Sequence, residues 1–228
     1  MDADQPSGAS TRDRYVAALA AVFAAIWLAL AIEPRHRADW ALENALVVLG
    51  VVVLALAHRR FALSRLSYTF VFAFLSVHVL GAHYTYSEVP YDAWVTALTG
   101  RSLNAALGWQ RNNFDRIAHL AYGLLLTYPL REVFVRVTGL RGFWSYFLPM
   151  DLAMSSSATY ELIEWGAAMV FGGELGIAYV GAQGDQWDAQ KDMSLAALGA
   201  VLATVAIAAT HRWRSGRSDR LRGSPPRG

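Results

Sequence analysis

Long apolar runs separated by shorter polar segments are the main pattern of the chain. Six of these runs are long enough to cross about 30 Å of hydrocarbon as a helix. The pattern predicts an all-α fold, a polytopic membrane bundle of about six transmembrane helices. We expect these helices at Tyr15–Ile32, Trp40–Ala57, Phe61–Ala82, Phe114–Val135, Phe143–Phe171 and Lys191–Thr210.

Polar segments at both ends flank a single predicted domain. Residues 1–13 are polar and rich in small side chains, and residues 211–228 are basic and end in Gly and Pro. Such segments bury too little apolar surface to fold, so we expect a disordered tail at 1–13 and a disordered cytoplasmic tail at 211–228. The transmembrane domain is expected at 14–210, with a short interfacial helix at Tyr91–Leu98.

Composition narrows the class of protein. Hydrophobic residues make up 55% of the 228 positions, too many for an ordinary soluble domain. The chain has no cysteine, which excludes disulfides, thiolate zinc sites and cysteine nucleophiles. Basic residues are spread over loops and the tail, so we expect a lipid bilayer and no nucleic acid as partner.

The distribution of Lys and Arg orients the predicted bundle. With a cytoplasmic N-terminus, the inner segments hold 14 of these residues and the outer loops hold 5. Cytoplasmic loops are enriched in Lys and Arg. Both termini of this multi-pass protein are therefore predicted to be cytoplasmic.

Almost every ionisable residue of the predicted spans falls near the outer face. A charge in hydrocarbon costs at least a few kcal/mol, so it persists only when it is paired, hydrated or bound to metal. The shared depth predicts one polar site, and Glu43 and Asn44 open the second span on the same side. The residues at this depth are His78, His83, Asp115, Arg116, His119, Glu161, Glu164, Asp185, Asp188 and Asp192.

Asp115 and His119 are four residues apart, which places a carboxylate and an imidazole on one helix face. In one interpretation Asp115 orients the imidazole, and His119 acts as a base or metal ligand. In the other, the two residues form a polar pair that only fixes the helix position. The spacing alone leaves both interpretations open.

Glu161 and Glu164 also share a helix face. Two carboxylates this close in a low dielectric need a proton, a cation or an arginine between them. Arg111 or Arg116 can supply the arginine, which would give a structural ion-pair network. A bound divalent metal or a shared proton would give a functional site instead.

Asp185, Asp188 and Asp192 lead into the sixth predicted span. Acidic residues favour a helix N-terminus, and Asp188 alone fits an N-cap. Capping explains three aspartates poorly, so we expect some of them to join the site. In the third span, His83 at the helix end is the expected site residue, and His78 is expected to be a packing residue.

The residue types at this depth suit a metal with nitrogen and oxygen ligands. Without sulfur, the candidates are Mn, Fe, Mg and Zn. Helix bundles build such sites from carboxylates and histidines that project inward from facing helices. The predicted ligands are His83, His119, Glu161, Glu164, Asp188 and Asp192.

Three segments carry a resemblance to a known family. They are FDRIAHL (Phe114–Leu120), YELIEW (Tyr160–Trp165) and GAQGDQWDAQKDM (Gly181–Met193). Over most of its length the chain resembles the YjdF-type family of uncharacterised bacterial inner-membrane proteins. The resemblance implies a multi-pass fold, a location in the bacterial inner membrane and no established activity.

The C-terminal half is also similar, more distantly, to VanZ-like proteins. Two positions depart from that family's pattern, since Glu164 replaces Gln and Ala196 replaces Asn. This resemblance implies a role at the cell envelope linked to glycopeptide resistance. The matching residues are Asp115, Arg116, His119, Glu161, Asp192 and Gly199.

Three functions follow from these observations. The first is an enzyme acting on a lipid or lipid-linked envelope substrate, in which His119, Asp115 and Glu164 are catalytic and Arg111 and Arg116 clamp a phosphate headgroup. The second is a transporter that uses the carboxylates as a proton or cation relay. The third is a structural or binding protein whose polar network fixes helix packing. About seven carboxylates face two arginines, and this excess favours a bound cation or protonated carboxylates.

Overall fold

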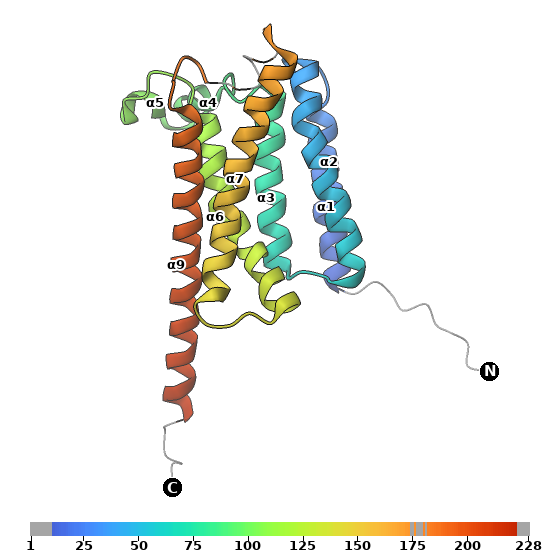
Figure 1. Cartoon of the computed structure of the whole chain (residues 1–228), viewed down its shortest axis with the longest axis vertical. Helices are drawn as coiled ribbons and strands as arrows, with labels where there is room; N and C mark the ends of the chain where they lie inside the picture. Colours follow the sequence, from blue (N-terminus) through green and yellow to red (C-terminus); the bar gives the residue numbers. More distant parts are fainter. Residues whose placement is uncertain (1–10, 174–175, 177–179, 181, 223–228) are drawn as a thin grey trace, which may run out of the picture.

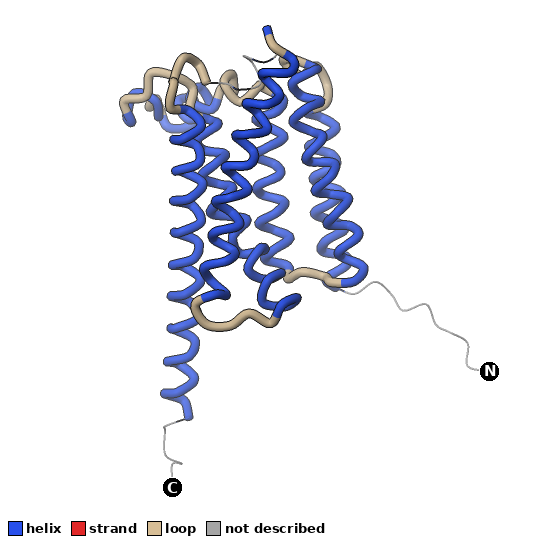
Figure 2. The backbone as a smooth tube through the Cα atoms, in the orientation of Figure 1, coloured by secondary structure: helices blue, strands red, loops and turns tan. Residues whose placement is uncertain are grey.

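A computed structural model describes residues 11–173, 176, 180 and 182–222. Within these residues the fold is all-helical and contains no strand, as the sequence predicts (Figure 2). The helices are α1 (Thr11–Leu30), α2 (Arg37–Arg60), α3 (Arg65–His83), α4 (Tyr91–Thr99), α5 (Leu103–Leu107), α6 (Phe114–Thr138), α7 (Trp144–Phe171) and α9 (Asp188–Arg222).

The six long helices coincide with the six predicted spans to within a few residues at most of their ends. Four of them, α1, α2, α3 and α9, are long and apolar enough to cross a membrane by length and composition. Helix α9 continues to Arg222, past the predicted end at Thr210, and α1 begins at Thr11. The remaining parts of the predicted tails, residues 1–10 and 223–228, lie outside the described residues.

The long helices stand side by side, and the start of α1 and the end of α9 lie at the same end of the bundle (Figure 1). The short helices α4 and α5 lie at the opposite end, which we call the polar end. Helix α6 packs against α3, α7 and α9, whereas α1 and α2 pack against α3. The starts of α6 and α9 and the last turns of α7 therefore meet at the polar end.

Helices α6 and α9 cross in close contact at two glycines. A Cβ atom on Gly123 would overlap the carbonyl oxygen of Ala196 and lie 2.7 Å from the nitrogen of Ala200. A Cβ atom on Gly199 would overlap the carbonyl oxygen of Leu120. Because no side chain fits at either position, the glycines let the two backbones touch, and they fix the first turns of both helices relative to each other.

At the end of the bundle near the termini, Glu132 joins α6 to the start of α3. Its carboxylate accepts hydrogen bonds from the Ser64 backbone nitrogen (2.8 Å), the Ser64 hydroxyl (2.7 Å) and the Ser67 hydroxyl (2.5 Å). Arg136 adds an ion pair at 2.7 Å. This carboxylate is fully satisfied by the chain, and its role is structural.

Candidate functional site

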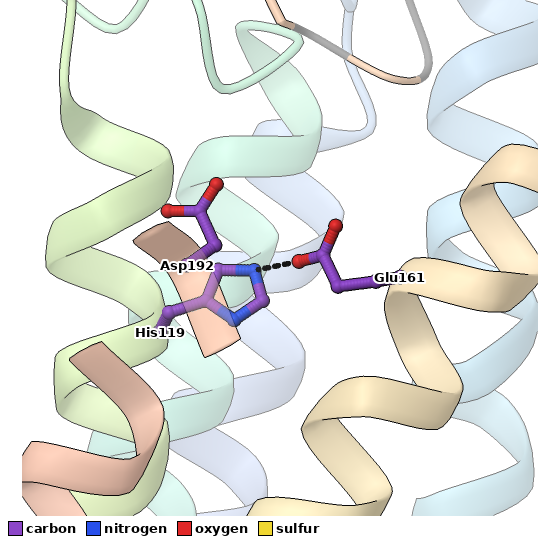
Figure 3. A group of neighbouring side chains, drawn as sticks. All are labelled: His119, Glu161 and Asp192. Carbon is purple, nitrogen blue, oxygen red and sulfur yellow. Dashed lines mark ion pairs between the residues drawn. The ribbon is translucent and has the colours of Figure 1, made fainter. Parts of the chain in front are cut away.

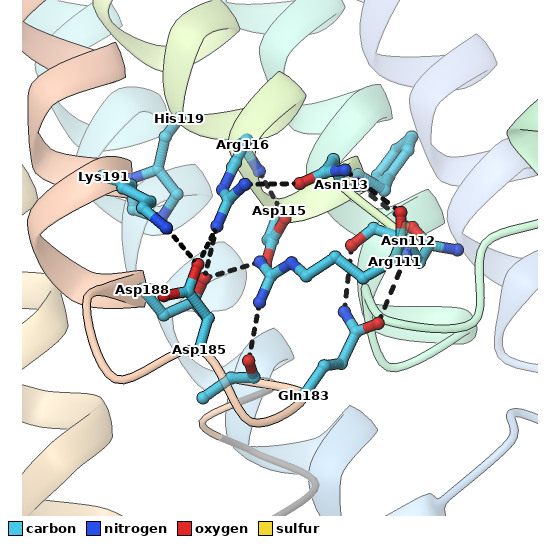
Figure 4. Close-up of polar contacts among 12 residues, drawn as sticks. Arg111, Asn112, Asn113, Asp115, Arg116, His119, Gln183, Asp185, Asp188 and Lys191 are labelled. Atoms are coloured by element: carbon cyan, nitrogen blue, oxygen red, sulfur yellow. Dashed lines mark hydrogen bonds and ion pairs between the residues drawn. The ribbon is translucent and has the colours of Figure 1, made fainter. Parts of the chain in front are cut away.

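Three aspartates and three cations meet where α6 and α9 begin (Figure 4). Asp188 lies 2.5 Å from Arg111 and 3.3 Å from Arg116. Arg111 also contacts Asp115 at 2.6 Å, and Arg116 contacts Asp185 at 2.6 Å. We call this group the terminal ion-pair cluster; its members are Arg111, Asp115, Arg116, Asp185, Asp188 and Lys191.

Hydrogen bonds from side chains to backbone groups connect the segment before α9 with the segment before α6. Arg111 donates to the carbonyl oxygen of Ala182 at 2.6 Å. The side-chain amide of Gln183 accepts from the Asn112 nitrogen at 3.2 Å and donates to the Asn112 carbonyl at 3.0 Å (Figure 4). The terminal ion-pair cluster thus closes the polar end of the bundle between these two segments.

Asp185 gives the cluster a pH dependence. The Lys191 ammonium, 2.5 Å away, together with the Trp187 backbone N–H and Arg116, holds the pKa of Asp185 well below its ordinary value. Because the pKa is lower in the folded protein than in the unfolded chain, the ionised carboxylate stabilises the fold above about pH 4. This stabilisation is lost as the pH falls through the folded-state pKa.

We therefore expect Asp185→Asn to unfold at a lower temperature than the wild-type protein at neutral pH, with a difference that shrinks as the pH falls well below about 4. Thermal unfolding in detergent at several pH values measures this difference. A difference that grows toward acid pH would show that Asp185 is not stabilised as an anion.

One helical turn further into the bundle, about 6 Å at 1.5 Å per residue, lies a group with different neighbours. His119 on α6, Glu161 on α7 and Asp192 on α9 point toward one another (Figure 3). One ligand atom of each lies within 4.8 Å of the other two. His119 Nε2 is 3.1 Å from Glu161 Oε1, and the Ser157 hydroxyl is 3.2 Å from His119 Nδ1.

Two carboxylate oxygens of this group, Glu161 Oε1 and Asp192 Oδ1, are buried without a hydrogen-bond partner in the described part of the chain. Asp192 is 3% exposed, and the side chain of Glu161 is 9% exposed. The contact between His119 and Glu161 has the length of an ion pair but not the geometry of a hydrogen bond. Because an unsatisfied buried polar atom costs about 1–3 kcal/mol, these oxygens fit a ligand that the chain does not supply.

A second set of contacts extends the group toward α2 and α3. Glu43 is 1% exposed and accepts a hydrogen bond from the Tyr160 hydroxyl at 2.7 Å. His78 Nε2 lies 3.8 Å from Glu43 Oε2, and His78 Nδ1 lies 2.5 Å from the Tyr86 hydroxyl. We call the whole group the buried carboxylate cluster; its members are Glu43, His78, His119, Glu161, Glu164 and Asp192.

A cavity of about 270 Å³ opens beside this cluster. Its volume is close to the lower end of the range for small-molecule sites, about 300–1,000 Å³. Apolar side chains of α2 and α3 form one part of its wall. The polar part of the wall includes His78, His119, Tyr122, Tyr160, Glu164 and Asp192.

The two clusters differ in charge balance. The terminal ion-pair cluster holds three cations for three aspartates. The buried carboxylate cluster holds four carboxylates and two histidines. Among the described residues, its ion pairs are His78 with Glu43 and His119 with Glu161. The excess of carboxylates that the sequence shows is therefore concentrated in the deeper cluster, where a proton or a bound cation has to offset it.

The structure assigns partners to the predicted site residues. Asp115 contacts Arg111, and His119 contacts Glu161. His83 lies outside both clusters, with Nδ1 2.8 Å from the carbonyl oxygen of Leu30. In its place His78, expected to be a packing residue, lines the cavity.

Four hydroxyl groups complete the site, and the sequence pattern does not mark them. The Tyr86 hydroxyl contacts His78, and the Ser157 hydroxyl contacts His119. The Tyr160 hydroxyl contacts Glu43, and Tyr122 lines the cavity. Tyr160 had one signal, its place directly before Glu161 in YELIEW. Tyrosines and serines are common in membrane helices, so residue type alone does not mark them.

These features define a polytopic helical membrane protein with a buried polar site between its helices. Residues 15–213 match the family model described as "Predicted membrane protein (DUF2238)", and the chain belongs to that family. It is similar to the inner membrane protein YjdF of Escherichia coli (strain K12), with 35% identity over 181 residues that cover 79% of this chain and 82% of the relative.

No solved structure gives a significant match. The family match and this relative confirm the predicted YjdF-type family and the predicted inner-membrane location. The resemblance to VanZ-like proteins stays a prediction.

Proposed function

We propose that the chain is a membrane-embedded, metal-dependent enzyme that acts on a lipid or lipid-linked envelope substrate. The observation that carries the proposal is the group formed by His119, Glu161 and Asp192, whose ligand atoms come from three helices and lie within 4.8 Å of one another. One nitrogen and two oxygen donors suit Mn, Fe, Mg or Zn. The two buried oxygens of Glu161 and Asp192 that lack a hydrogen-bond partner among the described residues support a cation at this point.

The surrounding residues suit hydrolysis or proton transfer. A divalent ion held by His119, Glu161 and Asp192 would supply a polarised water near neutral pH, because metal coordination lowers the pKa of bound water. His119 presents Nε2 to the group while the Ser157 hydroxyl holds Nδ1. Glu164 lines the cavity and is the candidate acid–base residue, and the hydroxyls of Tyr122 and Tyr160 would orient the polar part of a substrate.

The position of the cavity supports a substrate from the membrane. The cavity lies among spanning helices, one turn below the terminal ion-pair cluster. Arg111 and Arg116, predicted to clamp a phosphate, are each held by aspartates. In this proposal they form the rim of the cavity, and a headgroup phosphate contacts them by displacing a carboxylate.

A structural role has one observation in its favour. The terminal ion-pair cluster has the mutual arginine–carboxylate pairing that a purely structural network requires. The buried carboxylate cluster does not, since no arginine or lysine pairs with Glu161 or Asp192 within the described residues. We therefore assign the chemistry to the second cluster, and to the first cluster a structural role together with the headgroup contact at its two arginines.

Elemental analysis of detergent-purified protein, prepared without chelator, tests the metal site. The wild-type protein is expected to hold about one transition-metal or Mg ion per chain, and His119→Ala and Asp192→Asn are expected to lose it. His83→Ala is the matched control, because this histidine lies at the same end of the bundle but outside the group. Equal metal content in His119→Ala and the wild-type protein would contradict the assignment.

A second experiment tests the enzymatic part of the proposal. The protein is placed in vesicles of bacterial polar lipid extract with Mn²⁺, and the lipid classes are followed over time by mass spectrometry. We expect the wild-type protein to consume one lipid class and Glu164→Gln to leave it unchanged. A stoichiometric metal with no change in any lipid class would contradict an enzyme acting on these lipids.

A further inference from the structure

A second, larger cavity lies between α1, α2 and α3. Its volume is about 540 Å³, and almost all of its wall is apolar. No residue of α1 is buried, so this helix covers the cavity without packing tightly against its neighbours. The wall includes Ala20 and Ala24 of α1, Val48 and Val52 of α2, and Val71 and Leu75 of α3.

Polar contacts join these helices at both ends of the cavity, α1 and α2 at the polar end and all three helices at the other end. At the polar end, Trp27 Nε1 donates to Asn44 Oδ1 at 2.6 Å. At the other end, His58 Nε2 lies 3.4 Å from Asp13 Oδ1, and His58 Nδ1 lies 2.5 Å from the Tyr68 hydroxyl. The helices are thus fixed at two points, and the space between these points is an apolar slot in the middle of the bundle.

The length of the slot suits a hydrocarbon chain. Asp13 and Trp27 are fourteen residues apart in α1, so the two fixed points are about 21 Å apart at 1.5 Å per residue. One leaflet of a bilayer has a hydrocarbon thickness of about 15 Å. The slot therefore has room for an extended chain from one leaflet, and its small side chains, such as Ala20 and Ala24, leave that room open.

The slot adjoins the polar cavity described above. Val47 and Leu75 line both cavities, one from α2 and one from α3. Val47 is 4% exposed and stands one helical turn below Glu43. A molecule with a polar head beside His119 and Asp192 can therefore direct its tail past Val47 and Leu75 into the slot.

We infer that this slot binds one acyl chain of a membrane lipid whose headgroup occupies the polar cavity. The inference rests on the proposed function. It adds that the acyl chain of the substrate determines where the lipid binds. The polar cavity would recognise the headgroup, and the slot would hold the chain by burial of apolar surface. A single tethered chain also places the headgroup at a fixed depth beside the buried carboxylate cluster.

Photo-crosslinking tests the inference with a defined probe. The protein is placed in phosphatidylglycerol vesicles in which a fraction of the lipid carries a diazirine in the middle of one acyl chain, and the labelled peptides are mapped. We expect label on the wall residues of α1, α2 and α3, and label on the exposed face of α9 as an internal reference. Label on α9 without label on the slot would overturn the inference.

Two neighbouring alanines provide a matched pair of variants. Both alanines are exposed, but Ala24 lines the slot and Ala25 does not. Ala24→Phe is expected to remove most of the slot label and to leave the α9 label unchanged, because the ring fills the space of the chain. Ala25→Phe is expected to keep both. Equal loss or equal retention of slot label in the two variants would overturn the inference.

Metal content is measured in the same samples, so that a failure of the metal-enzyme proposal can be distinguished from a failure of the acyl-chain proposal. Ala24→Phe is expected to keep the metal, because Ala24 lies outside the His119–Glu161–Asp192 group. Metal without slot label overturns the acyl-chain site alone. Slot label without metal supports a lipid-binding slot and overturns the proposed metal enzyme.

Discussion

Replacing Gly123 by alanine is expected to lower the free energy of unfolding by about 3 kcal/mol, the upper end of the usual range for an overpacked contact. The added methyl group would overlap the backbone of α9 at Ala196, which cannot move aside as a flexible side chain can. The two helices would have to separate. Since His119 and Asp192 lie within the first two turns of these helices, we also expect the metal to be lost. Unfolding in detergent and elemental analysis measure the two effects.

Gly50→Ala is the control for this prediction. Gly50 lies within α2, and a Cβ atom there meets nothing within 4 Å. Alanine is a better helix former than glycine, so this variant is expected to be as stable as the wild-type protein or more stable by about 0.5–1 kcal/mol. Similar destabilisation in both variants would show that the glycine contact between α6 and α9 is not what holds the bundle.

Asp188→Asn is expected to destabilise the protein by about 3 kcal/mol, because it removes one charge from a buried ion pair. Asp188 lies 2.5 Å from Arg111 and also contacts Arg116. The side chains of Asp188 and Arg111 are 8% and 15% exposed, so water cannot replace the lost carboxylate. Thermal unfolding in detergent, with circular dichroism as the signal, measures the change.

The pair formed by Arg35 and Glu88 provides the comparison. Its atoms are also 2.5 Å apart, but the side chains are 64% and 43% exposed. Exposed ion pairs contribute little because water screens them and their side chains lose freedom. Glu88→Gln is therefore expected to unfold within error of the wild-type protein. A loss of stability as large as that of Asp188→Asn would mean that burial is not the deciding difference.

The depth of the polar residues could be predicted from the sequence, because depth depends on position along a span. An apolar run of about 20 residues fixes where a helix enters and leaves the membrane, and so it fixes the level of each charge within it. His119, Glu161 and Asp192 were placed at one level in this way, and the structure brings their side chains together. The order of the helices across the bundle has no such simple signal.

The partner that each polar side chain contacts depends on the order of the helices across the bundle. Asp115 and His119 share a helix face, which suggests that they contact each other, yet Asp115 pairs with Arg111, four residues earlier, and His119 pairs with Glu161 on α7. The direct contact of α6 with α9 adds further neighbours, because it places Asp188 beside Arg111 and Asp192 beside His119. That contact depends on glycines whose meaning is clear only once the facing backbone is known.

His78 lines the cavity, whereas the sequence favoured His83, and the cause lies in the turn after α3. Thr85 and Tyr86 both adopt positive φ angles, 56° and 52°, which few residues other than glycine do. This turn folds the Tyr86 ring back over Gly81 and brings its hydroxyl to His78. Nothing in the residue types of Thr85 and Tyr86 predicts such a turn, so the sequence favoured the histidine at the helix end.

The most direct test of the central claim is an anomalous diffraction measurement on crystals grown with Mn²⁺, with data collected at the manganese absorption edge. The predicted result is a single strong peak about 2.0–2.3 Å from His119 Nε2 and from carboxylate oxygens of Glu161 and Asp192. The absence of a peak among these three residues, or a peak only between Asp115, Asp188 and Asp192, would contradict the proposed site.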